Sequence, residues 1–338
     1  MQEEPSILDE AAVCLDVKGH VIARCTGQMT MDWCSASAVG LMSADRKQWS
    51  RFLVGLARVP RSVLPRIVSP TSIAGQLLPG PARQLGLHPG LPVVVGAGDV
   101  AAMAIGVGAG DVGSVSVSFG TSSWVAKTLG HRRLRTPEGV GVIQSVDDGR
   151  FLRVGESEAA GACVDWLADT FFENFGGVDR YEVLNNAAAK ALPGSDRLLF
   201  LPWLYGERAP ISDVNARAGF LNVGPDHRVE HFARATFEGV SLNTRMMLAA
   251  LKADGLPVRI GGGGARSDLW MQILADVTRC RIERVSRPED AGATGAGLIA
   301  TVALGLRGKS EKSAEAVESD RVFFPNAAHR SVYDDLFA

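Results

Sequence analysis

Asp99 is a carboxylate in an otherwise small and apolar stretch, "VVVGAGDVAAMAIG", directly after the β-branched run Val93–Val95. At the carboxyl end of a buried strand it would face the crevice where open α/β sheets bind ligands. A carboxylate at that place can act as a general base that takes a proton from a substrate hydroxyl group. A simpler alternative stays open, because Asp99 could instead cap a following helix through the N–H groups of Ala101 and Ala102.

Two glycine-containing turns offer groups that could hold an anionic ligand. The tip "GTSS" (120–123) presents backbone N–H groups and hydroxyls, which suit phosphate oxygens. The turn Gly261–Gly264 has no side chains, so a flat or anionic ligand can lie against its backbone, and Ser267 begins the next helix. An ordinary hairpin turn and a tight strand–helix connection are the simpler interpretations. Taken together with Asp99, the two turns indicate nucleotide-dependent phosphoryl transfer.

Three other short patterns are chance matches. "GGGGARSD" imitates a dinucleotide fingerprint, but Arg266 takes the place of the third glycine and would block close approach of helix and strand. "ALGLRGKS" has Ala303 where a Walker A loop needs glycine. "HRVEH" fits an inverted zinc-peptidase signature, yet no third ligand follows it. We therefore expect His227 and His231 to be surface or capping residues.

The elements that carry these residues are predicted to be both strands and helices. Apolar residues between Trp49 and Leu56 have helical spacing and indicate a helix that stops before Pro60. Since Val93–Val95 do not alternate with polar residues, their strand is expected to be buried on both faces. "SVSVSF" and the apolar residues after the GTSS tip predict a β-hairpin over 114–126.

The rest of the chain continues the alternation of strands and helices. It predicts helices over 157–172, 227–252 and 291–305, a strand that runs into a Pro/Gly-rich loop over 198–210, and a strand, glycine turn and helix over 258–277 with Ser267 as N-cap. The helix over 291–305 consists mostly of small residues and is suited to close packing. This alternation predicts an α/β fold.

Composition sets the general class of the protein. The chain has 338 residues, of which 46% are hydrophobic, enough for two domains with cores. A formal net charge of −2 without a Lys/Arg block argues against nucleic-acid or membrane partners. Cysteines that form no C-x-x-C pair indicate buried free thiols in a reducing compartment: Cys14, Cys25, Cys34, Cys163 and Cys280. With no secretory signal pattern and no long apolar run, we expect a cytoplasmic protein.

The order of the segments resembles the FGGY family of carbohydrate kinases, and its xylulokinase-like members most closely. "TGQMTMDWCSAS" (26–37) is similar to the family's T-G-x-x-x-T-D-Y-S-x-A-S stretch. The resemblance continues over nearly the whole chain from about Cys25. The other segments that carry it are "GAGDVAAMAIGVGAGDVGSVSVSFGTSSWV", "ESEAAGACVDWLADTFF", "FLPWLYGERAPISDVNARAGFLNV", "RATFEGVSLNTRMML" and "GGGGARSDLWMQILADV…AGATGAGLIA".

The resemblance implies an actin-like, ribonuclease-H-like ATPase fold whose two domains close on ATP, Mg²⁺ and a sugar or polyol. Residues 1–112 would be the rear part of the sugar-binding domain, and residues 113–338 a complete nucleotide-binding domain. The implied reaction transfers the γ-phosphate of ATP to a hydroxyl group of a ketose such as xylulose, or of a related polyol. Asp99 matches the catalytic base. The family's ATP-contacting positions fall on Gly120, Thr121, Ser122, Gly161, Gly262, Gly263 and Ser267.

The beginning of the chain departs from the family pattern. Members start with a D-x-G-T phosphate hairpin and a segment that supplies most sugar contacts, and this chain starts beyond both. "VCLDVKGHVIAR" (13–24) imitates such a hairpin through Asp16 and Gly19, but its alignment places it on a helix. Without the preceding strands, an exposed strand edge and apolar surface would favour a homo-oligomer or a complementing N-terminal fragment. The alternative to an active kinase is an incomplete remnant that serves as a nucleotide-binding or interaction module.

Overall fold

The chain divides into two compact units. The structure is a computed structural model that describes residues 10–43, 45–132, 135–172, 179–308 and 313–338. Unit 1 comprises the described residues of Met1–Gly106, Ile143–Phe151 and Gly292–Glu311, and unit 2 those of Val107–Val142, Leu152–Ala291 and Lys312–Ala338. Two later segments therefore belong with the N-terminal part, which a linear division at residue 112 does not include.

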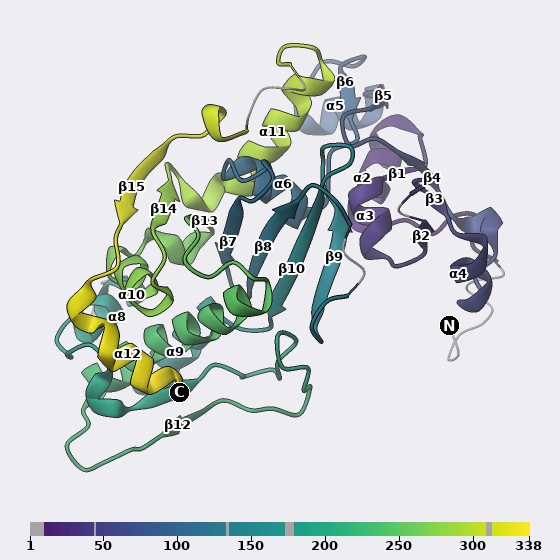
Figure 1. Cartoon of the computed structure of the whole chain (residues 1–338). Helices are drawn as coiled ribbons and strands as arrows, with labels where there is room; N and C mark the ends of the chain where they lie inside the picture. The colour runs from purple at the N-terminus through teal and green to yellow at the C-terminus, as the bar shows by residue number, and fades with distance from the viewer. Residues whose placement is uncertain (1–9, 44, 133–134, 173–178, 309–312) are drawn as a thin grey trace. The chain divides into compact units, whose positions relative to one another are not determined.

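Unit 1 consists of short helices and of short strands that form two-stranded sheets (Figure 1). Its elements are α2 (Val17–Thr26), β1 (Thr30–Asp32), α3 (Trp33–Ala38), β2 (Met42–Ser43), β3 (Gln48–Trp49), α4 (Arg51–Leu56), β4 (Arg66–Val68), β5 (Ile73–Gln76), α5 (Pro79–Leu85), β6 (Pro92–Val94), α6 (Asp99–Gly106) and nearly all of α11 (Ala291–Ala303). Strand β1 pairs with β4 in parallel, whereas β2–β3 and β5–β6 are antiparallel pairs.

The expected burial of the strand at Val93–Val95 is wrong in part. Among the described strands β6 pairs only with β5, and Val93 and Val94 are half-buried, whereas Val95 is buried. The predicted helix is confirmed as α4, which has six residues and ends before Pro60, with Phe52 and Leu56 76% and 73% exposed. Short apolar runs do not reveal how far other elements cover them.

The segment that imitates a phosphate hairpin is a helix. Asp16 has an extended backbone and forms the N-cap of α2, because its carboxylate accepts a hydrogen bond of 2.7 Å from the Gly19 N–H. Gly27 ends the same helix in the left-handed conformation, with φ of 74°. The alignment with a helix is therefore confirmed.

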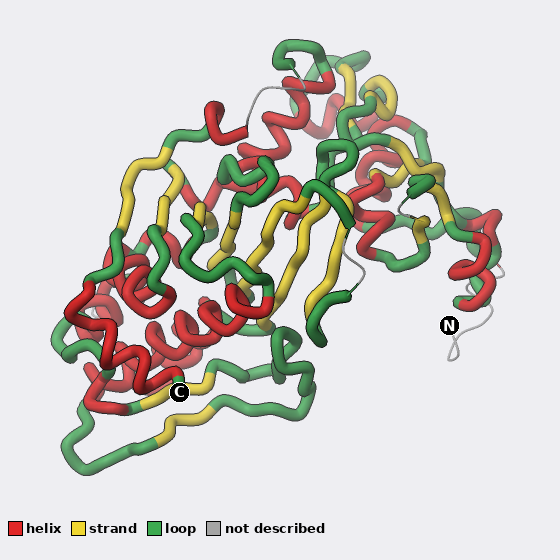
Figure 2. The backbone as a smooth tube through the Cα atoms, viewed as in Figure 1, coloured by secondary structure: helices red, strands yellow, loops and turns green. Residues whose placement is uncertain are grey.

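Unit 2 is built on a seven-stranded sheet. The strands follow the order β15-β14-β13-β7-β8-β10-β9 and lie side by side in Figure 2. They are β7 (Val115–Phe119), β8 (Ser123–Leu129), β9 (Val140–Gln144), β10 (Phe151–Ser157), β13 (Val258–Gly261), β14 (Ile282–Val285) and β15 (Ser319–Phe323). Strands β7 and β14 run parallel to β13 between them, and β7 and β8 form the predicted antiparallel hairpin.

Helices and a small strand pair complete unit 2. They are α7 (Gly161–Phe171), α8 (Arg180–Ala188), β11 (Leu199–Leu201), β12 (Gly219–Leu221), α9 (Val229–Ala250), α10 (Asp268–Thr278) and α12 (Arg330–Phe337). These bounds confirm the helices predicted within 157–172 and 227–252 and the strand–turn–helix predicted over 258–277. In the part of the chain that the structure describes, no helix is both long and apolar enough to cross a membrane.

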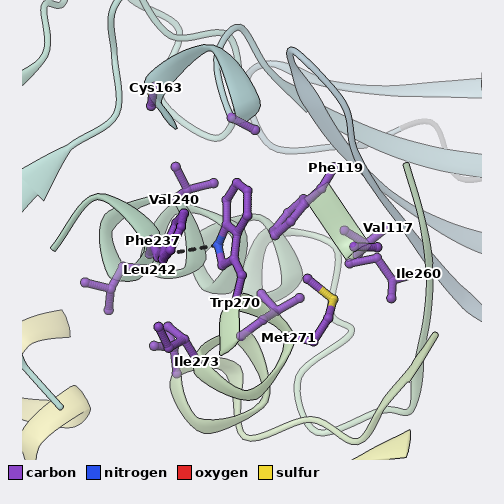
Figure 3. Close-up of a cluster of buried hydrophobic side chains, with 14 of the residues drawn as sticks. Val117, Phe119, Cys163, Phe237, Val240, Leu242, Ile260, Trp270, Met271 and Ile273 are labelled. Carbon is purple, nitrogen blue, oxygen red and sulfur yellow. Dashed lines mark hydrogen bonds between the residues drawn. The ribbon is translucent and has the colours of Figure 1, made fainter. Parts of the chain in front are cut away.

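Aromatic rings form the core between the sheet and its helices. The Trp270 ring lies with its centroid 4.9 Å from that of Phe119 and 4.9 Å from that of Phe237 (Figure 3). Its indole N–H donates to the Phe237 carbonyl at 3.2 Å, so the polar atom of this buried side chain is satisfied. Trp270 thereby ties the start of α10 to strand β7 and helix α9.

The cysteines are free thiols, with two differences from the predicted burial. Cys34, Cys163 and Cys280 are buried, and burial raises the pKa of each of these thiols. Cys25 is half-buried and Cys14 is exposed, so the predicted burial is wrong for these two. Cys14 precedes the first helix of unit 1.

The two histidines of "HRVEH" serve as caps at the start of α9. The His227 ring nitrogen Nδ1 accepts from the Gly224 N–H at 2.8 Å, and Nδ1 of His231 accepts from the Arg228 N–H at 2.9 Å. Nε2 of His231 lies 3.1 Å from a carboxylate oxygen of Asp196. The capping interpretation is confirmed.

Candidate active site

The two glycine turns lie next to each other at one edge of the unit 2 sheet. Strands β7 and β13 are parallel neighbours, with Ser118 opposite Gly261, so their carboxyl ends meet at the same edge. Gly262 has φ of 93°, and a Cβ atom there would collide with the carbonyl oxygen of Phe119. Only glycine allows this approach, which brings the turn against the strand that ends in the GTSS tip.

Helix α7 begins directly on the hairpin tip. The N–H groups of Ala160 and Ala162 donate to the Thr121 carbonyl at 2.9 and 3.0 Å, and that of Gly161 donates to the Gly120 carbonyl at 2.9 Å. These bonds satisfy the donors that a helix N-terminus leaves unpaired, and no side chain caps the helix. A Cβ on Gly161 would lie 2.6 Å from the Gly120 carbonyl oxygen, so this contact also needs glycine.

The outer side of the tip keeps its donors available. Thr121 and Ser122 are exposed. Within the ranges that the structure describes, neither their backbone N–H groups nor their hydroxyls have an acceptor. The Ser122 carbonyl accepts from the Gly120 N–H at 3.0 Å, which closes the turn. Such a turn can donate to phosphate oxygens without breaking any internal bond.

Ser267 already uses its hydroxyl inside the protein. It is the N-cap of α10 and accepts from the Trp270 N–H at 3.0 Å, as predicted. The same hydroxyl hydrogen-bonds to the amide oxygen of Asn185 on helix α8. Ser267 therefore joins α10 to α8, and a ligand acceptor would have to compete with Asn185 for its one O–H group.

A cavity of about 790 Å³ collects most of the predicted ATP-binding residues. It is lined by Gly120, Thr121, Gly161, Gly263 and Ser267. The residues Ser122 and Gly262, also predicted, do not line it. The volume is within the range of pockets for cofactors and other small molecules.

Sequence reasoning missed one wall of this cavity, which helix α8 supplies. Tyr181, Asn185 and Asn186 line it together with Asp165 of α7. The Tyr181 hydroxyl donates to the Asp165 carboxylate at 2.7 Å, and this hydrogen bond raises the pKa of Tyr181. No glycine turn or known motif marks α8 in the sequence. Its packing against α9 and α7 and the hydrogen bond from Ser267 to Asn185 bring it to the cavity.

Asp99 lies in unit 1, at the first residue of helix α6. Its side chain is exposed and accepts one hydrogen bond of 2.9 Å, from the N–H of Val100. The Ala102 N–H donates instead to the Gly98 carbonyl at 2.9 Å, so the predicted alternative of a cap through Ala101 and Ala102 is wrong. The carboxylate is free to accept a proton from a ligand. That Asp99 and the GTSS tip border one gap stays a prediction.

The backbone on both sides of Asp99 is held in place. On the strand side, the ammonium group of Lys18 donates to the Val95 carbonyl at 3.2 Å and lies 2.7 Å from the fully buried carboxylate of Asp32. On the helix side, α11 packs so closely that a Cβ on Gly295 would collide with the Ala102 carbonyl oxygen. The small residues of α11 thus serve the predicted close packing, against the helix that begins with Asp99.

Comparison with known proteins gives consistent similarities. Residues 1–106 match the N-terminal domain, and residues 115–304 the C-terminal domain, of the FGGY family of carbohydrate kinases. A xylulose kinase of Staphylococcus epidermidis is 29% identical over 341 residues, covering 100% of this chain and 68% of that protein. A gluconokinase of Bacillus subtilis is 29% identical over 311 residues, covering 88% of this chain and 60% of that protein. The crystal structure of a ligand-bound xylulose kinase from Lactobacillus acidophilus has a TM-score of 0.87 at 26% identity, covering 99% of this chain and 68% of that one.

Proposed function

Since the chain belongs to the FGGY family of carbohydrate kinases, we propose that it transfers the γ-phosphate of ATP to a hydroxyl group of a ketose such as xylulose, or of a related polyol. The observation that carries this proposal is the cavity of unit 2, because it gathers Gly120, Thr121, Gly161, Gly263 and Ser267 around one space. A ketose is preferred because the similarity to a xylulose kinase extends over 100% of the chain, against 88% for the gluconokinase.

In this proposal unit 2 binds the nucleotide. The phosphates of ATP lie at the GTSS tip, where Thr121 and Ser122 offer backbone N–H groups and hydroxyls that need no rearrangement. The adenosine lies along the glycine turn near Gly263 and against the wall formed by α8. Mg²⁺ would accompany ATP and would neutralise charge on its phosphate groups.

Unit 1 supplies the base for the reaction. The exposed carboxylate of Asp99 accepts the proton of the sugar hydroxyl as its oxygen attacks the γ-phosphorus and the bond to ADP breaks. Lys18 and the packing of α11 keep the backbone around Asp99 fixed, so that little reorganisation is needed. Catalysis then consists mainly of positioning and charge stabilisation, which is the usual demand of phosphoryl transfer.

ADP release tests this function directly. Purified protein with ATP, Mg²⁺ and xylulose should produce ADP well above the rate without a sugar, and gluconate should give less. Asp99→Asn should lower kcat about 10²–10⁴-fold, because general-base catalysis contributes about that much. ATP binding, measured by calorimetry, should be unchanged in the variant. Retained turnover in Asp99→Asn would remove Asp99 from the role of base, and ATP binding without any sugar-dependent ADP release would refute the kinase activity.

A further inference from the structure

A second cavity of unit 2 is lined by positive charges. It has a volume of about 650 Å³ and includes residues of strand β10 and of the C-terminal end of helix α9. Its charged lining residues are Arg132, Arg135, Arg153 and Lys252, with no carboxylate among the other lining residues. It shares no residue with the candidate nucleotide cavity, so it is a separate site.

Arg153 is buried in an unusual way for a cation. The residue is only 4% exposed, and its Nε atom is buried without a hydrogen-bond partner in the described structure. Its one hydrogen bond there runs from Nη2 to the Arg135 carbonyl, at 3.4 Å. Arg234 is similarly buried but has the usual partner of a buried cation, because its Nε lies 2.8 Å from the carboxylate of Glu238. Burying a guanidinium group without such a partner costs free energy. An anion that supplies the missing hydrogen-bond acceptor would therefore bind favourably.

The surrounding charges are not neutralised by the protein. In the ranges that the structure describes, Arg132, Arg135, Arg153 and Lys252 form no ion pair. The nearest acidic residues along β10 and its continuation, Glu156 and Glu158, are both paired with Arg208. The described lining of the cavity therefore carries positive charges and no carboxylate, although the whole chain carries a formal net charge of −2.

We propose that this cavity binds a small phosphorylated molecule that carries at least two phosphoryl groups. A guanidinium group matches the geometry of phosphate oxygens and can donate two parallel hydrogen bonds to them. The positive charges around this space exceed what one phosphate group neutralises. The volume is enough for a small organic ligand. Because the cavity is separate from the candidate nucleotide site, its ligand is an effector and not the phosphate donor.

Helix α9 offers a competing explanation for one of these charges. Cations near the C-terminal end of a helix are favourable by about 0.3–1 kcal/mol, and Lys252 lies directly after Leu251, the C-cap of α9. This effect does not account for Arg153, which lies on β10 and has an unpaired buried nitrogen. If Arg153 and Lys252 were purely structural, their substitution would change the stability of the protein and leave its anion binding unchanged.

Titration with inorganic pyrophosphate separates the two explanations. Calorimetry on the full chain, at constant ionic strength and without divalent metal, should give saturable binding. Arg153→Met should weaken it at least about tenfold, because hydrogen bonds to charged groups are among the strongest in proteins. Lys252→Met should weaken it about threefold, as expected for an exposed charge. Lys252 is exposed, so this variant keeps the test valid if Arg153→Met fails to fold.

Arg217→Met is the matched control. Arg217 is exposed in the same unit, and its guanidinium donates only to the carbonyls of Val214 and Ala216. Its removal changes the net charge by the same amount and should leave pyrophosphate affinity unchanged. The proposal is overturned if the wild-type chain binds no pyrophosphate, or if Lys252→Met and a folded Arg153→Met bind it as tightly as the control does.

Discussion

Neighbouring glycines in one turn serve different purposes. A side chain at Gly262 would need a left-handed backbone and would collide with Phe119, so this glycine is required by the fold. The Cβ position of Gly263 has no heavy atom within 4 Å, and its φ angle lies outside the left-handed region. Since Gly263 lines the candidate nucleotide cavity, its lack of a side chain matters only if a ligand lies there.

This difference gives a prediction at the level of one methyl group. Gly263→Ala should keep the thermal stability of the wild type, because the new methyl group meets only open space. It should weaken ATP binding about tenfold, since overfilling a close-packed contact costs about 1–3 kcal/mol. Thermal unfolding and ATP calorimetry measure the two effects. Gly262→Ala is the control, and it should lose stability. An unchanged ATP affinity in Gly263→Ala would move the nucleotide away from this turn.

Glu207 is a buried carboxylate that joins three segments of unit 2. Its Oε2 atom accepts from the Ser157 hydroxyl at 2.9 Å and from the Asn243 amide at 2.7 Å, and Oε1 accepts from the Arg208 N–H at 2.7 Å. Ser157 ends β10 and Asn243 belongs to α9. Burial raises the pKa of Glu207 above its usual range, although these hydrogen bonds act in the opposite direction.

The raised pKa predicts the sign of a pH effect. The folded protein holds this proton more tightly than the unfolded chain, whose glutamate pKa is about 4.3. The contribution of Glu207 to stability is therefore complete below about pH 4.3 and is lost as the pH rises through the folded-state pKa. The free energy of unfolding of the wild type, minus that of Glu207→Gln, should fall over this range in urea titrations. Glu138→Gln, at an exposed site, is the comparison variant. A difference that rises with pH would contradict the prediction.

Elements with a strong local signal were predictable from the sequence. The β7–β8 hairpin follows from alternation around the GTSS tip, and helix α9 from a long apolar stripe. The burial of strand β6 was mispredicted, because burial of a short apolar run depends on neighbours distant in the sequence. The site shows the same division. Its glycine turns have a local signature, whereas the wall from α8 depends on tertiary packing alone.

Helix α11 supports α6 through the absence of one side chain. Gly295→Ala would push the new methyl group into the Ala102 carbonyl and displace the helix that begins with Asp99. We expect a loss of about 1–3 kcal/mol in the free energy of unfolding, as for an overpacked core, and a lower kcat. Urea unfolding and ADP release measure the two effects.

Gly297 on the same helix is a matched control. Its Cβ position is open and the residue is exposed. Gly297→Ala should therefore stabilise the protein by about 0.5–1 kcal/mol, since alanine favours a helix over glycine by about that much. Equal effects of the two substitutions would mean that close packing against α6 is not what Gly295 provides.

At the scale of the whole chain, the actin-like ATPase fold expected from the sequence is confirmed by the match to both family domains and by the similarity to a solved xylulose kinase. The sheets of the two units differ in size. Within the described residues, unit 2 has one continuous seven-stranded sheet, whereas the sheets of unit 1 are two-stranded. The β1–β4 pair is parallel, an arrangement that normally occurs in larger, covered sheets. Unit 1 therefore offers strand edges on which further pairing is possible.

Helix α4 leads to a prediction about association. Phe52 and Leu56 lie four residues apart, hence on one helix face, and both are largely exposed. Burying such an apolar face gains about 25 cal/mol per Å², so we expect self-association as the concentration rises. Sedimentation velocity should show a mass above the 35.8 kDa of one chain. Phe52→Ser with Leu56→Gln should restore the monomer, while Leu192→Gln, at an exposed leucine of unit 2, should not. A monomer at every concentration would contradict self-association through this face of α4.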